Sequence, residues 1–150
     1  MAKEIERKFL VKDKSFISAA FDVIDIAQGY LSVDPDRVVR VRIAGEKAFL
    51  TVKTRNNGPV RHEWEYEIPI KDAGEMLQSA THTIAKTRYF VKGSDGHVWE
   101  VDCFKGGNEG LIVAEIELAD TEISFEIPDF VGEEVTGDAR YYNSNLAAQV

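Results

Sequence analysis

The sequence contains a single cysteine, Cys103, among its 150 residues. One cysteine cannot form a disulfide within the chain, and it cannot supply a cysteine-rich zinc site. The sequence also lacks an apolar N-terminal stretch of signal-peptide length and any segment apolar enough to span a bilayer. These absences predict a cytoplasmic protein without a membrane partner.

The motifs of several common enzyme classes are missing as well. The three histidines, His62, His82 and His97, do not have the spacing of a zinc motif. Neither a Walker-type phosphate loop nor a Gly-x-Ser-x-Gly nucleophile elbow occurs. We therefore expect His62 and His97 to be structural or surface residues.

Positive charge is in deficit, with 18 Lys and Arg against 26 Asp and Glu and a formal net charge of -8. Such a balance argues against a nucleic acid or an anionic membrane as partner, because either favours a basic surface. An anionic small molecule is still compatible, because a local cationic cluster or a bound divalent cation can reverse the sign at one site.

The rest of the composition is that of an ordinary globular protein, with 44% hydrophobic and 29% charged residues. The chain is long enough to bury a core, and it contains no internal repeat, linker or low-complexity stretch. We expect residues 1–150 to form a single domain.

Alternation between two residue classes, which is the pattern of half-buried strands, dominates the sequence. Gly-rich and Asn-rich clusters such as Asn56-Asn57-Gly58-Pro59 separate several of these segments and favour hairpin turns. Successive strands joined by short turns imply an antiparallel meander. The predicted strands are 3–11, 38–43, 48–54, 60–68, 86–92, 98–104 and 111–119.

Helical patterns are few. A short helix is expected over 14–21, and a second over 73–80 with Asp72 as its N-cap. The Ala-rich tail from Asn143 to Val150 would close the fold as a small helix. The predicted fold class is therefore mostly β, with small helical additions.

Charged residues occupy one face of nearly every predicted strand. Side chains two apart on a strand point the same way, so Glu4, Glu6 and Lys8 share one face of the first strand, opposite Ile5 and Phe9. The corresponding faces of the other strands carry Arg40 and Arg42; Thr51 and Lys53; Arg61, Glu63, Glu65 and Glu67; Lys86 and Arg88; Glu100 and Asp102; and Glu115 and Glu117.

Two arrangements can explain these faces. In the first, a half-buried sheet simply turns its polar face to water, as antiparallel sheets commonly do. However, these faces consist almost entirely of Arg, Lys and Glu. Like charges at adjacent positions on a face also repel each other unless opposite charges lie between them. The second arrangement, a closed barrel with a charged lumen, provides those opposite charges and points the apolar face outward. Helices or a partner subunit would then cover the outside.

A lumen with both acidic and basic clusters suits metal-assisted chemistry on a polyphosphate. Arg and Lys bind phosphate oxygens, while carboxylates hold Mg²⁺, which usually keeps several waters and also binds the substrate's phosphates. Two carboxylates could also hydrolyse a glycoside, but the density of Arg and Lys on the same faces argues against that reaction.

The N-terminal Glu4-Ile-Glu6-Arg-Lys8 resembles the Glu-x-Glu-x-Lys signature of the CYTH superfamily, the triphosphate tunnel metalloenzymes. That motif alone is weak, but further motifs follow in the family's order across essentially the whole chain. They are Gln28-Gly-Tyr30-Leu-Ser32, Arg40-Val-Arg42, Leu50-Thr-Val-Lys53, Glu63-Trp-Glu65, Lys86-Thr-Arg88-Tyr, Trp99-Glu-Val-Asp102, Ala114-Glu115-Ile-Glu117-Leu, Glu134-Val-Thr-Gly-Asp138 and Arg140-Tyr-Tyr-Asn143.

The resemblance implies an eight-stranded antiparallel β-barrel that forms a tunnel, with short helices and a C-terminal helical segment. By position, the triphosphate-binding residues would be Lys8, Arg40, Arg42, Lys53, Lys86 and Arg88, with Arg140 contributing from the closing segment. The ligands of Mg²⁺ or Mn²⁺ would be Glu4, Glu6, Glu115 and Glu117, together with Glu63 and Glu65, which could instead orient water or pair with a lysine. Lys8 is the candidate catalytic residue, activating or orienting the attacking water. It would need a lowered pKa to act as a base.

The family does not fix the substrate. Compact single-domain members look most like inorganic triphosphatases, so hydrolysis of inorganic triphosphate to pyrophosphate and phosphate is the leading expectation. A class IV-type adenylate cyclase, a thiamine or nucleoside triphosphatase and a non-catalytic polyphosphate-binding module are the alternatives. The apolar outer face would suit a homodimer.

Overall fold

The computed structural model describes residues 3–148, which form nine strands, three α-helices and two short 3-10 helices. In chain order the elements are β1 (Lys3–Val11), α1 (Phe16–Ala19), β2 (Asp22–Asp34), β3 (Arg37–Ala44), β4 (Lys47–Lys53), β5 (Val60–Ile68), α2 (Ile70–Ser79), β6 (His82–Lys92), β7 (Val98–Phe104), a 3-10 helix (Gly106–Asn108), β8 (Ile112–Glu117), β9 (Val131–Glu134), a 3-10 helix (Ala139–Tyr141) and α3 (Asn143–Ala148).

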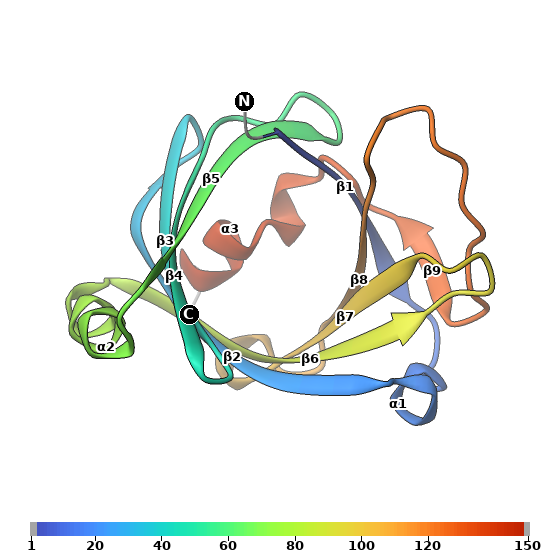
Figure 1. Ribbon diagram of the computed structural model, residues 1–150, viewed down its shortest axis with the longest axis horizontal. Coiled ribbons are helices and arrows are strands. Elements are labelled where there is room, and N and C mark those ends of the chain that lie inside the picture. Colours follow the sequence, from blue (N-terminus) through green and yellow to red (C-terminus); the bar gives the residue numbers. More distant parts are fainter. Residues whose placement is uncertain (1–2, 149–150) are drawn as a thin grey trace.

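Eight of the strands close into an antiparallel barrel, as the family resemblance implied (Figure 1). The hydrogen-bonded order is β5-β4-β3-β2-β6-β7-β8-β1, and a pairing between β1 and β5 completes the ring. Two meanders, β2 to β5 and β6 to β8, make up most of the wall, and α2 connects them. Among the described residues, the ninth strand, β9, pairs only with β1.

Strand β1 changes partners along its length. Residues 3–5 pair with β5, residues 6–10 pair with β8, and the end of the strand also pairs with β9. The chain after β9 then runs along β1, where Val135 N donates to Lys8 O at 2.8 Å and Lys8 N donates to Thr136 Oγ1 at 2.9 Å. Residues 135–136 therefore lie against β1 where it has left β5.

The main hydrophobic core lies outside the barrel wall. The aromatic rings of Phe9 and Trp99 are 5.4 Å apart at their centroids, and Phe125 packs on Trp99 at 5.9 Å. Phe125 belongs to the long connection from β8 to β9, which loops outside the barrel in Figure 1. Phe16 of α1 is fully buried in the same cluster. A smaller cluster around Val41 packs under α2.

The C-terminal helix α3 lies within the ring of strands when the molecule is viewed along the barrel (Figure 1). Leu146 and Ala147 of α3 are buried against an apolar set on the inward faces of the strands, which comprises Tyr30, Val38, Ile84, Phe104 and Val113. One end of the lumen is thus filled by a helix.

Some boundaries differ from the predictions. Strand β2 was not predicted from periodicity, although the family motif Gln28–Ser32 falls within it, and β6 begins at His82 rather than at 86. Helix α2 begins at Ile70, three residues early, and Pro69 is its N-cap. The N-cap prediction for Asp72 is wrong, because Asp72 lies in the first turn, where its charge still complements the helix dipole.

The expected helix over 14–21 is the four-residue α1. Of the predicted C-terminal helix, α3 accounts for Asn143–Ala148, and residues 149–150 lie outside the described residues. Within residues 3–148, no helix has the length and apolar character needed to cross a membrane.

Candidate active site in the barrel lumen

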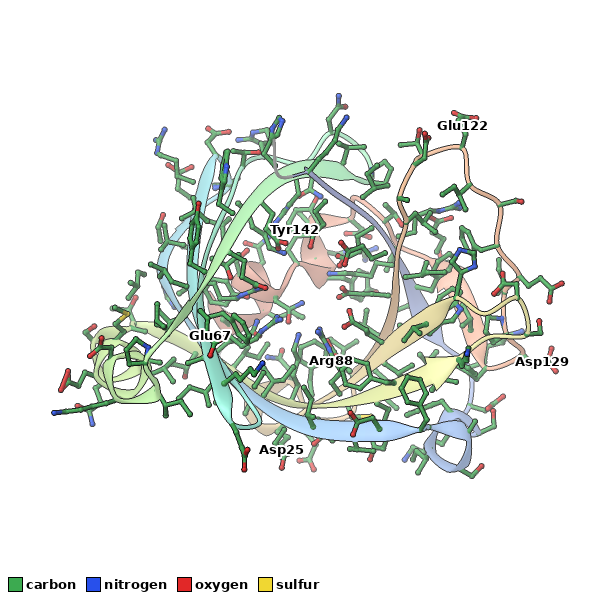
Figure 2. All side chains as sticks on the ribbon, viewed as in Figure 1. Asp25, Glu67, Arg88, Glu122, Asp129 and Tyr142 are labelled. Carbon is green, nitrogen blue, oxygen red and sulfur yellow. The ribbon has the colours of Figure 1, made fainter. Side chains whose placement is uncertain are left out.

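The charged faces predicted from the sequence meet in one cavity of about 210 Å³ inside the barrel. Figure 2 shows Arg88 and Tyr142 on opposite sides of the open lumen, whereas Asp25, Glu122 and Asp129 lie outside the barrel. The predicted site residues that line the cavity are Glu4, Glu6, Lys8, Arg40, Arg42, Lys53, Glu63, Glu65, Lys86, Arg88, Glu115 and Glu117.

Register explains how residues distant in sequence come together. Lys8 of β1 is directly opposite Glu115 of β8, and Glu6 is opposite Glu117. Because both strands alternate with the same phase, all four side chains point into the lumen.

Arg140 is the predicted site residue that the structure does not bring into the cavity. Its side chain is 77% exposed, and its Nη2 pairs with Asp138 at 2.7 Å. Asp138 also caps the 3-10 helix by accepting from Arg140 N. Both contacts are local, so the sequence motif places Arg140 near the site without pointing its guanidinium inward.

The lumen also contains residues absent from the predicted site. Arg61 and Glu100 line the cavity; strand alternation placed both on charged faces, but neither was assigned to the site. Tyr142 and Asn143 line it from the C-terminal segment. Strand periodicity cannot identify these two residues, because the tertiary fold alone brings that segment into the barrel.

Lys53 and Arg40 are held by carboxylates on other strands of the barrel. Lys53 Nζ is 3.2 Å from Glu4 Oε1 and 3.1 Å from Glu63 Oε2, so it bridges β1 and β5. Arg40 Nη2 is 3.2 Å from Glu65 Oε2. These pairs explain why like charges can occupy adjacent positions on one strand.

Asp102 anchors a buried pair of cations. Lys86 Nζ lies 2.7 Å from Asp102 Oδ2, and Arg88 donates to both carboxylate oxygens at 2.8 and 2.9 Å. Burial would raise the pKa of Asp102, but Lys86 and Arg88 outweigh it and lower that pKa to about 2. Burial, with Arg88 and Arg42 nearby, lowers the pKa of Lys86 to about 7. Lys86 also donates to Asn143 Oδ1 at 2.8 Å.

Lys8 is also buried but has a different environment. Its Nζ donates to Tyr141 O at 3.0 Å and lies 3.6 Å from Glu115 Oε1. Burial alone would lower the pKa of Lys8, but the carboxylates of Glu115 and Glu6 outweigh it, so the pKa is raised. Lys8 is therefore a cation at neutral pH, which suits orienting water or binding phosphate rather than abstracting a proton.

Carboxylates are crowded on the β1 and β8 side of the cavity. Burial and the neighbouring charges of Glu115 and Glu4 raise the pKa of Glu6 well above its ordinary value. Partial burial and Glu4 likewise raise the pKa of Glu117. For Glu115, Lys8 outweighs burial and holds the pKa well below its usual range.

This crowding fits a divalent cation, which would offset the negative charge that Glu6 and Glu117 carry on ionisation. Within residues 3–148, no three Asp, Glu, His or Cys side chains are gathered closely enough to hold an ion by themselves. Mg²⁺ commonly binds one or two carboxylates and takes its remaining ligands from water and substrate phosphates. The donor set therefore fits an ion that binds together with a phosphorylated substrate.

Comparisons with known proteins agree with this geometry. The CYTH domain matches residues 2–145 of the chain. An inorganic triphosphatase of Acetivibrio thermocellus is 49% identical over 148 residues, which cover 97% of this chain and 94% of that protein. An inorganic triphosphatase of Nitrosomonas europaea is 38% identical, with 98% of each chain covered. A crystal structure of an inorganic triphosphatase superposes with a TM-score of 0.68 at 32% identity, covering 100% of this chain and 97% of that one.

Proposed function

The chain belongs to the CYTH domain family, and from this premise we propose that it hydrolyses inorganic triphosphate to pyrophosphate and phosphate. Membership implies dependence on a divalent metal, and we propose Mg²⁺ or Mn²⁺ as the ion. Two relatives that match nearly the full length of the chain are named inorganic triphosphatases, which supports this substrate.

The main support for the proposal is that basic and acidic side chains line the same cavity in equal number. Seven basic residues line the cavity among residues 3–148, and an equal number of glutamates lie with them. The basic residues are Lys8, Arg40, Arg42, Lys53, Arg61, Lys86 and Arg88, and the glutamates are Glu4, Glu6, Glu63, Glu65, Glu100, Glu115 and Glu117. Binding a polyanion needs the first set, and holding its metal needs the second.

Each group of residues would have a separate task. Glu4, Glu6, Glu115 and Glu117 would hold the metal, with Glu63 and Glu65 as further candidates. When bound, the metal would polarise the phosphoryl group and offset its charge. Arg40, Arg42, Lys53 and Arg88 would hold the phosphate oxygens, as would Lys86 in its protonated form. Lys8, kept cationic by Glu115, would position the attacking water or a phosphate oxygen.

A substrate panel tests the proposal. Purified protein would be assayed with tripolyphosphate, thiamine triphosphate, ATP and pyrophosphate, each with Mg²⁺, Mn²⁺ or Ca²⁺. We expect phosphate release to be fastest from tripolyphosphate with Mg²⁺ or Mn²⁺. Equal or faster turnover of ATP or thiamine triphosphate would replace the proposed substrate.

The same preparation separates the remaining alternatives. Cyclic AMP formed from ATP with saturating Mn²⁺ would indicate a cyclase, and its absence would remove that reaction. Tight triphosphate binding with no hydrolysis would indicate a binding module. The cytoplasmic location and the homodimer remain predictions from the sequence, and a sedimentation measurement tests the dimer.

A further inference from the structure

Two of the seven basic residues that line the cavity stand apart from the others. Lys8, Arg40, Lys53, Lys86 and Arg88 each have a carboxylate partner within 4.0 Å. Arg42 and Arg61 line the same cavity, but neither forms an ion pair with any described residue. Their positive charges are therefore not neutralised by a direct partner within residues 3–148.

Both arginines are instead held by a neutral amide. Arg42 Nε donates to Gln28 Oε1 at 2.9 Å, and Arg61 Nη2 donates to Asn56 Oδ1. An amide oxygen fixes the direction of a guanidinium without cancelling its charge, and each guanidinium has further N–H groups to donate. This is the arrangement expected of a side chain that binds an anionic ligand.

The two arginines approach the cavity from different parts of the wall. Arg42 is opposite Phe49 on β4, which is opposite Glu67 on β5. Arg61 is on β5, six residues before Glu67, which places the two backbones roughly 20 Å apart along the strand direction. Both arginines line the same cavity, so they approach a ligand bound between them from different ends.

The surroundings of Arg61 restrict what can bind beside it. Its guanidinium carbon lies 5.8 Å from the centre of the Tyr142 ring, which projects into the lumen in Figure 2. Asn56, Pro59 and Thr136 line the same cavity. A compact phosphate group suits such a place better than a nucleoside does.

We propose that Arg61 binds one terminal phosphate of the substrate while Arg42 binds the other, so that Arg61 selects a chain with two free ends. This inference rests on the proposed function. Both ends of inorganic triphosphate are free phosphates. In a nucleoside triphosphate one end is an ester, which carries less charge and a bulky substituent. Arg61 is thus a specificity-determining residue as well as a binding residue.

The test compares two substrates in one variant. In Arg61→Gln, kcat/KM for tripolyphosphate should fall about tenfold or more, as expected when a hydrogen bond to a charged group is lost. The value for ATP should change less than about twofold, because the proposal places the ester end of ATP beside Arg61, where its lower charge gains little from the guanidinium. Arg61→Lys should give an intermediate loss, since lysine keeps the positive charge but cannot form the two parallel hydrogen bonds of a guanidinium. Arg55→Gln is the matched control, because Arg55 is exposed and pairs with Asp36.

The outcomes distinguish this inference from the proposed function. If the wild-type protein does not hydrolyse tripolyphosphate, the proposed function fails, and metal-free calorimetry of tripolyphosphate binding then tests Arg61. Weaker binding in Arg61→Gln than in Arg55→Gln would still support contact with a phosphate. An equal loss for both substrates, or no loss for either, would overturn the selective role. Unchanged melting temperatures would exclude misfolding as the cause of a loss.

Discussion

The lumen has two ends with opposite chemistry, although the same strands build both. Along the inward faces of β3, β6 and β8, an apolar residue is followed two and four positions later by charged ones. The series are Val38, Arg40 and Arg42; Ile84, Lys86 and Arg88; and Val113, Glu115 and Glu117. The apolar end is filled by α3, and the charged end forms the cavity.

The difference shows how a small helix defines the depth of the site. Leu146 and Ala147 provide apolar partners where the strands are apolar. Nearer the beginning of α3, Asn143 Oδ1 accepts from Lys86, and the carbonyl of Tyr141 accepts from Lys8. The apolar residues of α3 thus face the apolar strand residues, and the polar groups at its beginning and just before it face the charged strand residues. These polar groups form one wall of the cavity.

The largest expected effect separates function from stability at the charged end. In Glu6→Gln, we expect phosphate release from tripolyphosphate to fall about 100-fold or more, as when a group that stabilises the transition state is removed. The folded-state pKa of Glu6 is raised, so its ionisation opposes folding as the pH rises above about 4.3. The neutral Gln avoids this cost, so the melting temperature in metal-free buffer at pH 7.5 should rise.

A lower melting temperature for Glu6→Gln would contradict the assignment of crowded carboxylates at this end. The isosteric amide keeps the side-chain volume, so packing changes would not account for the result. Differential scanning calorimetry with and without Mg²⁺ makes the comparison directly.

The next effect concerns the apolar end. Leu146→Ala removes a side chain that is 4% exposed, and it should destabilise the fold by about 2–5 kcal/mol. Chemical denaturation measures this change. The control is Ile127→Ala, where the side chain is 56% exposed and the expected change is within about 0.5 kcal/mol. Equal losses in the two variants would mean that α3 does not fill the barrel.

A smaller effect concerns pH. Lys86 has a pKa lowered to about 7, so it loses its charge in the folded protein as the pH rises through neutrality. In metal-free binding of tripolyphosphate between pH 6 and pH 8.5, this loss should weaken the wild-type protein relative to a variant whose charge is permanent. In Lys86→Arg the charge is permanent, so the wild-type affinity should fall relative to that of the variant as the pH rises. Calorimetry at both pH values gives the ratio of the wild-type affinity to the Lys86→Arg affinity. A ratio that does not change with pH would contradict the lowered pKa of Lys86.

The smallest effect is expected at Arg140. Its guanidinium pairs with Asp138 outside the cavity, so Arg140→Ala should change kcat/KM for tripolyphosphate by less than about twofold, as usual for an exposed ion pair. Arg42→Ala, assayed beside it, should raise KM far more. A similar rise in both would indicate that the closing segment moves on binding and brings Arg140 inward.

Much of this site could be predicted because strand alternation is a local property. Once the first strand puts Glu4, Glu6 and Lys8 on one face, the same rule applied to β3, β6 and β8 finds most of the lumen. Strand β2 was not predicted from periodicity because its residues alternate poorly between apolar and polar, as in Ala27, Gln28 and Gly29. Arg61 and Glu100 lay on predicted faces; Arg61 is outside the quoted family motifs, and Glu100 is inside the Trp99–Asp102 motif but was given no role.

The sequence by itself determined which side chains face the lumen, because a period of two is set by the backbone. The charged faces also favoured a closed barrel over an open sheet, and the family motifs implied one. Only the tertiary structure decided where the cavity ends, which lysine is buried beside Asp102, and that Arg140 points away. The end of the cavity and the surroundings of Lys86 depend on contacts such as Lys86 with Asn143 and Arg61 with Tyr142, which join parts of the chain more than 50 residues apart and which no local pattern encodes. Arg140 points away because its guanidinium pairs with Asp138 two residues earlier, a choice of partner that the sequence motif does not reveal.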